Sequence, residues 1–340
     1  MMRLSSADDT AIRLHLNESV HGASPRALET AHRALADISI YPDPARTRLS
    51  EAIARHLGLA DGQVVVANGS DELVMLTALA VGGDGPGLVT DGTFPGYRTC
   101  LETVGRPVLS TPLEDFEGFL AAMPKAGIAF YCNPHNPTGA TLSRERLDRL
   151  VDTAARSGVP LVLDEAYLEF APEGIPQGLH HMSGEAPLIT LRTFSKAHGL
   201  AALRIGYALG SAELLRRIRV AQGAMPFSAN RIAQETAITA LDDTGHIRQV
   251  RERNAARRDW FCAQLAARGR SFLPSAANFV AVSVSDGKVA QDTLERDHRI
   301  LVRDAGLFGF PGYLRVSLGA PEHLTRLLDV LDVLDPITGR

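Results

Sequence analysis

The chain has 340 residues, of which 45% are hydrophobic and 22% are charged, and its formal net charge is −4. This length exceeds one ordinary hydrophobic core, so we expect two unequal domains. A mildly acidic chain has no general attraction for nucleic acids or anionic membranes, which favours a small molecule as the partner over either polyanion.

The N-terminal region, residues 1–18, mixes charged and apolar residues without a continuous apolar run, so we expect no signal peptide there. No segment of the sequence approaches the length of a membrane span. The cysteines lie far apart and lack the spacing of a metal knuckle or a disulfide framework: Cys100, Cys132 and Cys262. We therefore expect a cytoplasmic protein with reduced thiols and no bound metal.

Short β-rich runs alternate with helical patterns through the first two thirds of the chain. The β-rich runs cover residues 64–67, 87–90, 128–133, 160–167, 188–194 and 204–210, with helical patterns at 71–81, 97–104 and 144–158. This alternation predicts a mainly parallel sheet with helices on both faces. Ligands of such sheets bind at the carboxyl ends of the strands, so the chemistry is expected there.

The pattern changes after Met225. Two long helical patterns follow, at residues 231–243 and 246–269, and the second is amphipathic, as expected of a connecting helix. Beyond them, strands at 279–284, 300–304 and 313–319 mix with helices at 288–298 and 321–334, which suits a smaller α+β domain. We divide the chain into a large domain, residues 37–228, and a small domain of residues 1–36 and 229–340.

Residues 67–76 predict a strand, a Gly-Ser turn and the start of a helix. The backbone N–H groups of Gly69, Ser70 and Asp71 at that helix start can bind an anion, because they are unpaired and lie at the positive end of the helix dipole. A capping box without any ligand has a similar sequence.

Residues 132–143 contain two Asn-Pro steps followed by Gly139. Such steps break regular structure, so an ordinary loop between a strand and a helix is the default interpretation. The loop nevertheless lies at the ligand-binding edge of the sheet, where it can direct Asn136 at a ligand hydroxyl.

An apolar run at residues 160–163 ends in Asp164 and Glu165, and Tyr167 follows closely. An acid at a buried strand end needs a cationic partner or a strong donor. A protonated pyridine nitrogen is such a partner, and the carboxylate in turn keeps that nitrogen protonated. A helix N-cap or a metal ligand explains this segment equally well.

Lys196 follows the β-rich run at 188–194 and precedes a turn rich in glycine and alanine, which places its amine at the carboxyl end of a strand. Partial desolvation and nearby cations such as Arg204 depress the pKa of such a lysine, making it a nucleophile toward an aldehyde. Taken alone, a surface lysine in a loop is the commoner case.

These four motifs, in this order, resemble the class I and II aminotransferases of fold type I, which use pyridoxal phosphate. The resemblance extends over nearly the whole chain, from residues 16–22 to residues 313–319. It implies the α/β fold of aspartate aminotransferase, with a large domain built on a mainly parallel sheet and a smaller α+β domain.

The resemblance also implies roles for single residues. Lys196 matches the lysine that holds the cofactor as a Schiff base and then moves a proton at the substrate. Asp164 matches the aspartate that pairs with the pyridine nitrogen, while Tyr167 and Asn136 match the two donors to the phenolic oxygen. Lys196, Asp164 and Tyr167 are thereby the expected catalytic residues.

The same resemblance assigns the rest of the cofactor site. Thr193 and Arg204 match the hydroxyl and guanidinium that hold the cofactor phosphate, with backbone donors from Ser70 and Asp71. Phe94 lies where an aromatic side chain stacks on the pyridine ring.

Tyr41, within residues 40–44, resembles the tyrosine that reaches across a dimer interface to the neighbouring phosphate. The resemblance thus implies a homodimer with shared active sites. Without it, a tyrosine in a proline-rich turn indicates only a surface turn.

Arg315 matches the arginine that binds the acidic group of the substrate, and Arg303 resembles a second arginine of the histidinol-phosphate branch. Both are otherwise explained as structural ion-pair arginines. The segment that begins at Asn17 departs from the usual pattern by placing His21 where an aromatic residue is common, and Ser228 stands where asparagine is usual. We expect Asn17 and His21 beside the substrate.

The nearest branch includes histidinol-phosphate aminotransferase and threonine-phosphate decarboxylase. We expect an aminotransferase of amino-acid biosynthesis that moves an amino group between a small amino acid or amino alcohol, histidinol phosphate first, and a 2-oxo acid. The alternatives are a decarboxylase or oxidase of an amino acid on the same fold, in specialised metabolism, and a non-catalytic binding domain. The complete set of cofactor residues argues against the last.

Overall fold

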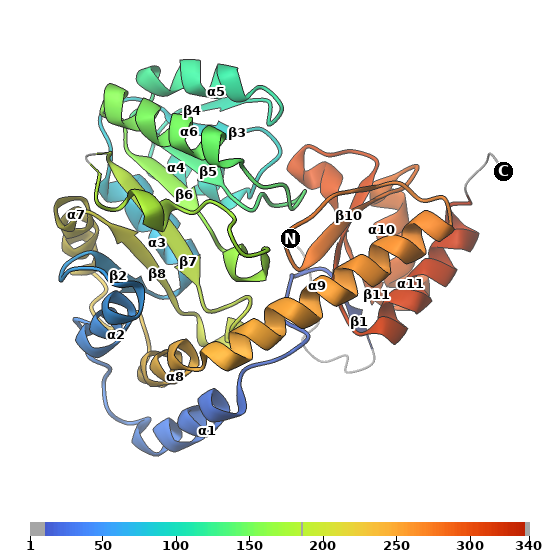
Figure 1. Ribbon diagram of the computed structural model, residues 1–340, viewed down its shortest axis with the longest axis horizontal. Coiled ribbons are helices and arrows are strands. Elements are labelled where there is room, and N and C mark those ends of the chain that lie inside the picture. The colour runs from blue at the N-terminus through green and yellow to red at the C-terminus, as the bar shows by residue number, and fades with distance from the viewer. Residues whose placement is uncertain (1–10, 185, 337–340) are drawn as a thin grey trace.

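The computed structural model describes residues 11–184 and 186–336 of the chain. The long helix α9 (Thr244–Ala267) runs across the molecule in Figure 1, from the large domain on the left to the small domain on the right. The larger part is built on a seven-stranded sheet and the smaller on a four-stranded sheet. The prediction of a large α/β domain with a smaller α+β domain is confirmed.

The large sheet has the order β2-β8-β7-β6-β5-β3-β4. Its strands are β2 (Val64–Ala67), β3 (Gly87–Thr90), β4 (Val108–Thr111), β5 (Ile128–Cys132), β6 (Leu161–Asp164), β7 (Leu188–Thr193) and β8 (Gly206–Gly210). Only β8 runs against its neighbours, and the other pairs are parallel. The central strands are buried along their whole length, as their nearly continuous apolar sequences predict.

Helices cover both faces of this sheet. They are α1 (Pro25–Ala34), α2 (Thr47–Leu57), α3 (Gly69–Ala80), α4 (Gly96–Thr103), α5 (Phe116–Ala122), α6 (Arg144–Ser157), α7 (Ala212–Gln222) and α8 (Arg231–Asp242). Side chains of α3, α4 and α7 pack on one face, and those of α2, α5, α6 and α8 on the other. Successive residues of a strand point to opposite faces, so Phe130 joins the first core and Tyr131 the second.

Several helices begin where the sequence supplies a cap. Ser143 accepts a hydrogen bond from the backbone of Arg146 at the start of α6, and Ser24 accepts one from Ala27 at the start of α1. Short 3-10 segments complete the chain: η1 (Leu35–Asp37), η2 (Met123–Lys125), η3 (Leu168–Phe170), η4 (Gly178–His181), η5 (Ala201–Leu203) and η6 (Ala305–Phe308). Within the described ranges, no helix combines the length and apolar character needed to cross a membrane.

The small domain holds an antiparallel sheet of order β12-β13-β10-β9 and a short parallel pair of β1 with β11. Its elements are β1 (Ile12–Arg13), β9 (Phe272–Leu273), β10 (Phe279–Ser283), α10 (Gly287–His298), β11 (Ile300–Leu301), β12 (Arg303–Asp304), β13 (Tyr313–Ser317) and α11 (Pro321–Leu334). Strand β1 therefore brings the N-terminal segment into this domain.

Helices α1 and α8 lie side by side beneath the large sheet in Figure 1. Ala27 of α1 and Ala233 of α8 belong to the same buried cluster as Val66 and Tyr207 of the large sheet. The expected boundaries at residues 36/37 and 228/229 stay a prediction, and this packing favours placing α1 and α8 with the large domain.

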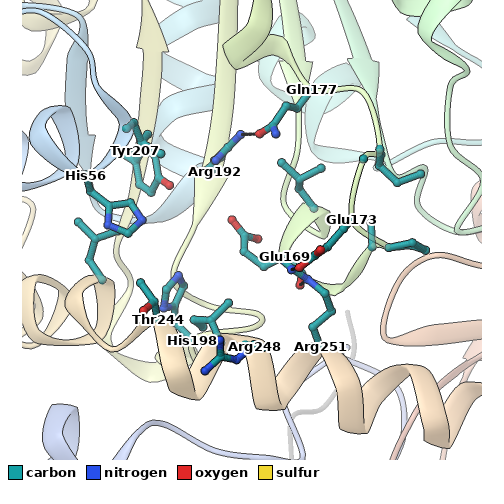
Figure 2. Close-up of a pocket in the computed structure, with 18 residues that line it drawn as sticks. His56, Glu169, Glu173, Gln177, Arg192, His198, Tyr207, Thr244, Arg248 and Arg251 are labelled. Atoms are coloured by element: carbon teal, nitrogen blue, oxygen red, sulfur yellow. Dashed lines mark hydrogen bonds and ion pairs between the residues drawn. The ribbon is translucent and has the colours of Figure 1, made fainter.

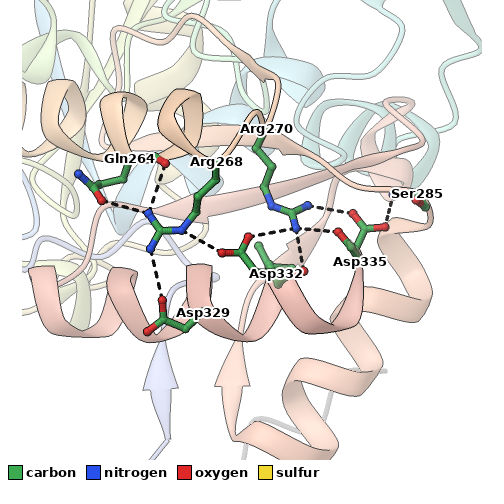
Figure 3. Close-up of polar contacts among 8 residues, drawn as sticks. Gln264, Arg268, Arg270, Ser285, Asp329, Asp332 and Asp335 are labelled. Carbon is green, nitrogen blue, oxygen red and sulfur yellow. Dashed lines mark hydrogen bonds and ion pairs between the residues drawn. The ribbon is translucent and has the colours of Figure 1, made fainter. Parts of the chain in front are cut away.

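Two arginines just beyond the end of α9 fasten it to α11, a contact that we call the α9–α11 seam (Figure 3). Arg270 Nη1 lies 2.9 Å from Asp335 Oδ2, and Arg270 Nη2 donates to the backbone oxygens of Leu331 and Asp335, both at 2.7 Å. Arg268 Nε lies 3.1 Å from Asp332 Oδ2. The buried Arg270 side chain thus meets protein acceptors at both terminal nitrogens.

Candidate active site

A cavity of about 550 Å³ opens at the carboxyl ends of β5, β6 and β7 and is closed on one side by the small domain. This is the edge at which open α/β sheets bind ligands. The predicted site residues that line it are Asn17, Ser70, Asp71, Phe94, Asn136, Asp164, Tyr167, Thr193, Lys196, Arg204, Arg303 and Arg315. Twisted strands from distant parts of the sequence therefore bring nearly the whole predicted set together.

Asp164, the last residue of β6, is buried at the floor of this cavity. The Tyr97 hydroxyl donates to its Oδ2 at 2.6 Å, and the Ala166 backbone N–H donates to its Oδ1 at 3.0 Å. No cation of the described residues forms an ion pair with it. Burial raises the pKa of Asp164 to about 6, so this carboxyl is suited to a ligand that brings a cationic N–H donor.

Lys196 extends into the same cavity from the turn after β7. Its Nζ donates to the backbone oxygen of Leu16 at 2.9 Å and lies 5.7 Å from the centre of the Tyr167 ring. Burial, and after it the charge of Arg315, lowers the pKa of Lys196 to about 8. A larger fraction of this amine is unprotonated at neutral pH than in an exposed lysine, which makes it a better nucleophile.

An anion-binding corner forms where α3 begins. Ser70 and Asp71 lie in the first turn of α3, whose N–H groups have no intrahelical partner. Arg204 crosses this corner, with Nη2 2.8 Å from Asp71 Oδ2 and Nη1 3.3 Å from Ser195 Oγ. Gly69 has φ +83° there, a conformation that favours glycine, and a Cβ on it would lie 2.7 Å from Arg204 Nη2, so a larger residue would make the guanidinium shift.

Asn17 and Tyr167 connect the N-terminal segment and the small domain to the cavity wall. Asn17 Nδ2 donates to the Tyr167 hydroxyl at 3.0 Å, and the Ser317 hydroxyl of β13 donates to Asn17 Oδ1 at 2.9 Å. Burial raises the pKa of Tyr167 to about 12. The phenol is therefore neutral at working pH and keeps a proton that it can donate to a ligand oxygen.

Two arginines form the wall that the small domain contributes. Arg303 of β12 and Arg315 of β13 are direct partners in the antiparallel pair, and their guanidinium carbons lie 5.7 and 5.1 Å from the centre of the Phe308 ring. Arg315 donates to Asn136 Oδ1 at 2.7 Å and to the His15 backbone oxygen at 2.6 Å, and forms no ion pair with any described carboxylate. Burial lowers its pKa to about 10, still well above neutral.

The cavity is also lined by residues that the sequence did not single out, among them His15, Tyr97 and Ser195. Ser195 directly precedes Lys196, so its place in the motif was a usable signal. Tyr97 occupies an apolar position of a predicted helix, and nothing in the sequence distinguishes it. His15 is buried with its Nδ1 unpartnered, and burial, followed by the charge of Arg13, lowers its pKa to about 4, so this imidazole is neutral.

Two predicted residues do not line the cavity. Tyr41 is 75% exposed and stacks on Phe227 with ring centres 4.6 Å apart. His21 lies near Arg257, Arg253 and His246, where burial lowers its pKa to about 4. The imidazole that lines the cavity is thus His15, six residues before the expected one. Ser228, which stands where asparagine is usual, also lies outside the cavity lining and accepts a hydrogen bond from Arg46 at 2.9 Å.

The donors and acceptors of this cavity fit pyridoxal phosphate. Asp164 suits a protonated ring nitrogen, the start of α3 with Arg204 suits a phosphate, and Lys196 suits an aldehyde. In the part of the chain that the structure describes, no group of His, Cys, Asp or Glu side chains is placed to hold a metal ion.

Comparisons with known proteins agree with this geometry. Residues 9–331 match the family model described as aminotransferase class I and II. Histidinol-phosphate aminotransferase from Geobacillus sp. (strain WCH70) is 36% identical over 329 residues, which is 94% of this chain and 89% of the relative. The crystal structure of histidinol-phosphate aminotransferase from Sinorhizobium meliloti in complex with pyridoxal-5'-phosphate superposes with a TM-score of 0.85 at 31% identity, covering 95% of this chain and 90% of that one. Aspartate aminotransferase from Thermus thermophilus with maleate gives a TM-score of 0.83 at 25% identity, covering 94% and 91%.

Proposed function

The chain belongs to the class I and II aminotransferases, which makes it a pyridoxal-phosphate-dependent enzyme, and on this premise we propose that it moves an amino group between histidinol phosphate and a 2-oxo acid. The observation that carries the choice of substrate is the pair of guanidinium groups from β12 and β13 beside the cavity. Arg315 is buried and has no carboxylate partner among the described residues, which is costly, and an anionic substrate offsets that cost. The names of the relatives point to the same substrate.

Each residue around the cofactor binds a different part of it in this proposal. Bound pyridoxal phosphate supplies an aldehyde and an electron-withdrawing ring. Asp164 keeps a proton on the ring nitrogen, Tyr167 and Asn136 hold the phenolic oxygen, and Phe94 covers the ring face. The start of α3, Thr193 and Arg204 hold the phosphate. Each role follows from the side chain's place in the cavity and from the family resemblance.

Lys196 has two tasks in this proposal. Its Nζ would hold the cofactor through the aldehyde, which the depressed pKa of about 8 favours because the unprotonated amine is the nucleophile. As a free amine beside the bound substrate, the same Nζ would take the proton from the substrate Cα and return it to the carbon that came from the cofactor's aldehyde. The Leu16 backbone oxygen, 2.9 Å away, keeps the amine oriented between these steps.

Arg315 and Arg303 orient the substrate by its acidic groups. Arg315 donates hydrogen bonds to Asn136 and to the His15 backbone, and these bonds fix the orientation of its guanidinium group. A 2-oxo acid presents its carboxylate to the same arginine in the second half of the reaction. The neutral His15 imidazole beside this pair offers a hydrogen bond to an uncharged part of the substrate.

A substrate comparison tests the proposal. The purified holoenzyme is incubated with 2-oxoglutarate and either histidinol phosphate or histidinol, and glutamate formation is followed. Two guanidinium contacts to the phosphate favour the phosphorylated amine by about 2–5 kcal/mol, or roughly 30-fold or more in kcat/KM. Arg303→Ala should reduce this preference.

The outcomes separate the alternatives. Equal kcat/KM for the two amines, in wild type and in Arg303→Ala, contradicts the histidinol-phosphate proposal and favours a plain amino-acid substrate. Release of carbon dioxide or peroxide in place of glutamate from an amino-acid panel identifies a decarboxylase or an oxidase instead.

We also propose that the protein is a homodimer in which Tyr41 serves the partner's active site. Large apolar side chains are exposed around it, among them Ile38 at 72%, Ile40 and Phe227. Contiguous exposed apolar surface of this kind is typical of protein interfaces. A place in the cytoplasm stays a prediction.

Two measurements examine the dimer. Sedimentation at micromolar concentration should give the mass of two chains, and mixing inactive Lys196→Ala with an inactive bulky Tyr41 variant should restore part of the activity through hybrid dimers. A monomer that retains full activity contradicts the shared site.

A further inference from the structure

A second cavity of about 400 Å³ lies behind the active site, and Figure 2 shows its lining. It is enclosed by the segment that follows Tyr167, by the turn between α8 and α9, and by β7 and β8. Adjacent residues on a strand face opposite ways. Thr193 accordingly lines the active site, whereas Arg192 lines this second space, which we call the back cavity.

Most charges of the back cavity already have partners within the protein. Arg192 donates from Nε and Nη2 to Glu165 Oε2, both at 3.0 Å, and from Nη2 to Gln177 Oε1 at 2.6 Å. Arg251 Nη1 lies 3.1 Å from Glu173 Oε1. These ion pairs leave neither guanidinium in need of an external anion.

Glu169 is the buried exception, whereas Arg248, which also lines the cavity, is an exposed residue of α9. Its Oε2 is buried and has no hydrogen-bond partner, and in Figure 2 its carboxylate points into the open centre of the cavity. Burial raises the pKa of Glu169 to about 6, against the opposing charge of Arg192, so at neutral pH the group is largely a carboxylate whose Oε2 lacks a donor. His198, across the cavity, is also buried, and its Nδ1 has no partner.

The remaining lining is largely apolar. Leu57, Leu168, Leu241 and Ile247 supply side chains to the wall. An apolar enclosure with a few convergent polar groups is the usual character of a small-molecule site. When water fills the cavity, these apolar surfaces stay hydrated. A ligand with an apolar body removes them from water, which is favourable.

We propose that the back cavity binds a small organic cation that carries N–H donors, such as a guanidinium or an imidazolium. Its charged N–H group donates to Glu169, and its apolar body packs on the leucines. The neutral His198 accepts a second hydrogen bond at Nδ1. An anion is disfavoured by the unpaired Glu169 carboxylate, and a metal ion lacks further ligands among the described residues.

Propylguanidine is a suitable probe, with propylurea as its neutral counterpart of similar shape. The guanidinium stays protonated at neutral pH and does not condense with an aldehyde as a primary amine does, so the cofactor site is left intact. Isothermal titration of the holoenzyme should show saturable binding of propylguanidine and at least about tenfold weaker binding of propylurea, because a hydrogen bond between charged groups is the stronger one.

Matched variants locate the binding. Glu169→Gln, which keeps the shape and removes the charge, should abolish the preference for the guanidinium. Glu252→Gln makes the same change in overall charge at an exposed position of α9 and should bind like wild type. A wild-type crystal soaked with propylguanidine gives a test that needs no variant, with density expected beside Glu169. Equal binding of both probes, undiminished binding to Glu169→Gln, or density only in the active-site cavity overturns the proposal.

Discussion

Two buried arginines, one in the α9–α11 seam and one in the active-site cavity, differ in whether a carboxylate pairs with them. Arg270 is 3% exposed and Arg315 is 5% exposed, so both have lost most of their water. Arg270 meets carboxylates of α11 and of the residue after it, whereas Arg315 meets only an amide oxygen and a backbone oxygen. The two arginines are equally buried and differ in their partners. Arg270 is paired within the protein and stabilises it, whereas Arg315 keeps its charge for a ligand.

Two neighbouring acids repeat this contrast within the large domain. Glu165 is fully buried and pairs with Arg192 at 3.0 Å. Asp164 receives hydrogen bonds from Tyr97 and Ala166 but forms no ion pair with a described residue. In both comparisons, the charged group without an ion-pair partner lines the active-site cavity, and its paired counterpart lies outside that cavity.

The largest expected effect comes from exchanging the two acids for their amides. Asp164→Asn should keep bound cofactor and lose turnover by about 100-fold or more, because removing one partner of a buried charge pair costs about 3–5 kcal/mol. Glu165→Gln should instead lower the free energy of unfolding, since it leaves Arg192 without its partner. Single-turnover kinetics and denaturant melts measure the two quantities, and an Asp164→Asn enzyme with normal turnover would show that this acid is only structural.

The two arginines should separate in the same manner. Arg315→Ala should weaken binding of anionic substrates by about 2–5 kcal/mol and leave the free energy of unfolding nearly unchanged. Arg270→Ala should lower the free energy of unfolding by about 3 kcal/mol, because it leaves the carboxylates of α11 without their cationic partner. Its KM should stay near the wild-type value. Substrate titrations and urea melts on both variants check that one substitution affects binding and the other affects stability. If Arg315→Ala lowers the free energy of unfolding as much as Arg270→Ala does and still binds substrate normally, the contrast between the two regions is wrong.

A smaller effect concerns pH and the protein freed of its cofactor. The pKa of Asp164 is about 6 in the folded chain against 3.8 for an ordinary aspartate, so between these values the folded state holds a proton that the unfolded state has lost. Stability must therefore fall as pH rises through that window. Relative to Asp164→Asn, the wild-type apoprotein should lose on the order of 2 kcal/mol between about pH 4 and about pH 7.

Urea melts of both proteins across this range measure the difference. Glu169 titrates in the same region in both proteins, so its contribution cancels. A difference that grows in the opposite direction would mean that Asp164 has a cationic partner in the apoprotein.

The sequence predicted the parts of the site that lie at strand ends. Asp164 and Lys196 each follow an apolar run that forms a central strand, and parallel strands bring their carboxyl ends to one edge. The alternation of apolar runs with helical patterns likewise predicted the large sheet. These features depend on local sequence and on one rule of topology.

Other features depend on packing between distant elements. Tyr97 reaches Asp164 only because α4 packs on the sheet against α3 and β3, and no local pattern marks that hydroxyl. The N-terminal segment has φ +54° at Asn17 and +68° at Gly22, and with these turns His15 faces the cavity while His21 lies beyond it. The pairing of α1 with α8, separated by about two hundred residues, was equally hidden from the sequence.

The covalent attachment of the cofactor tests the central claim most directly. The sequence contains only three lysines, Lys125, Lys196 and Lys288, so reduction of the holoenzyme with borohydride followed by peptide mapping has few possible answers. We expect the reduced pyridoxyl group on Lys196 alone, and none bound covalently in Lys196→Ala. A pyridoxyl group on Lys125, on Lys288 or on the N-terminal amine would contradict the assignment of this cavity as the active site.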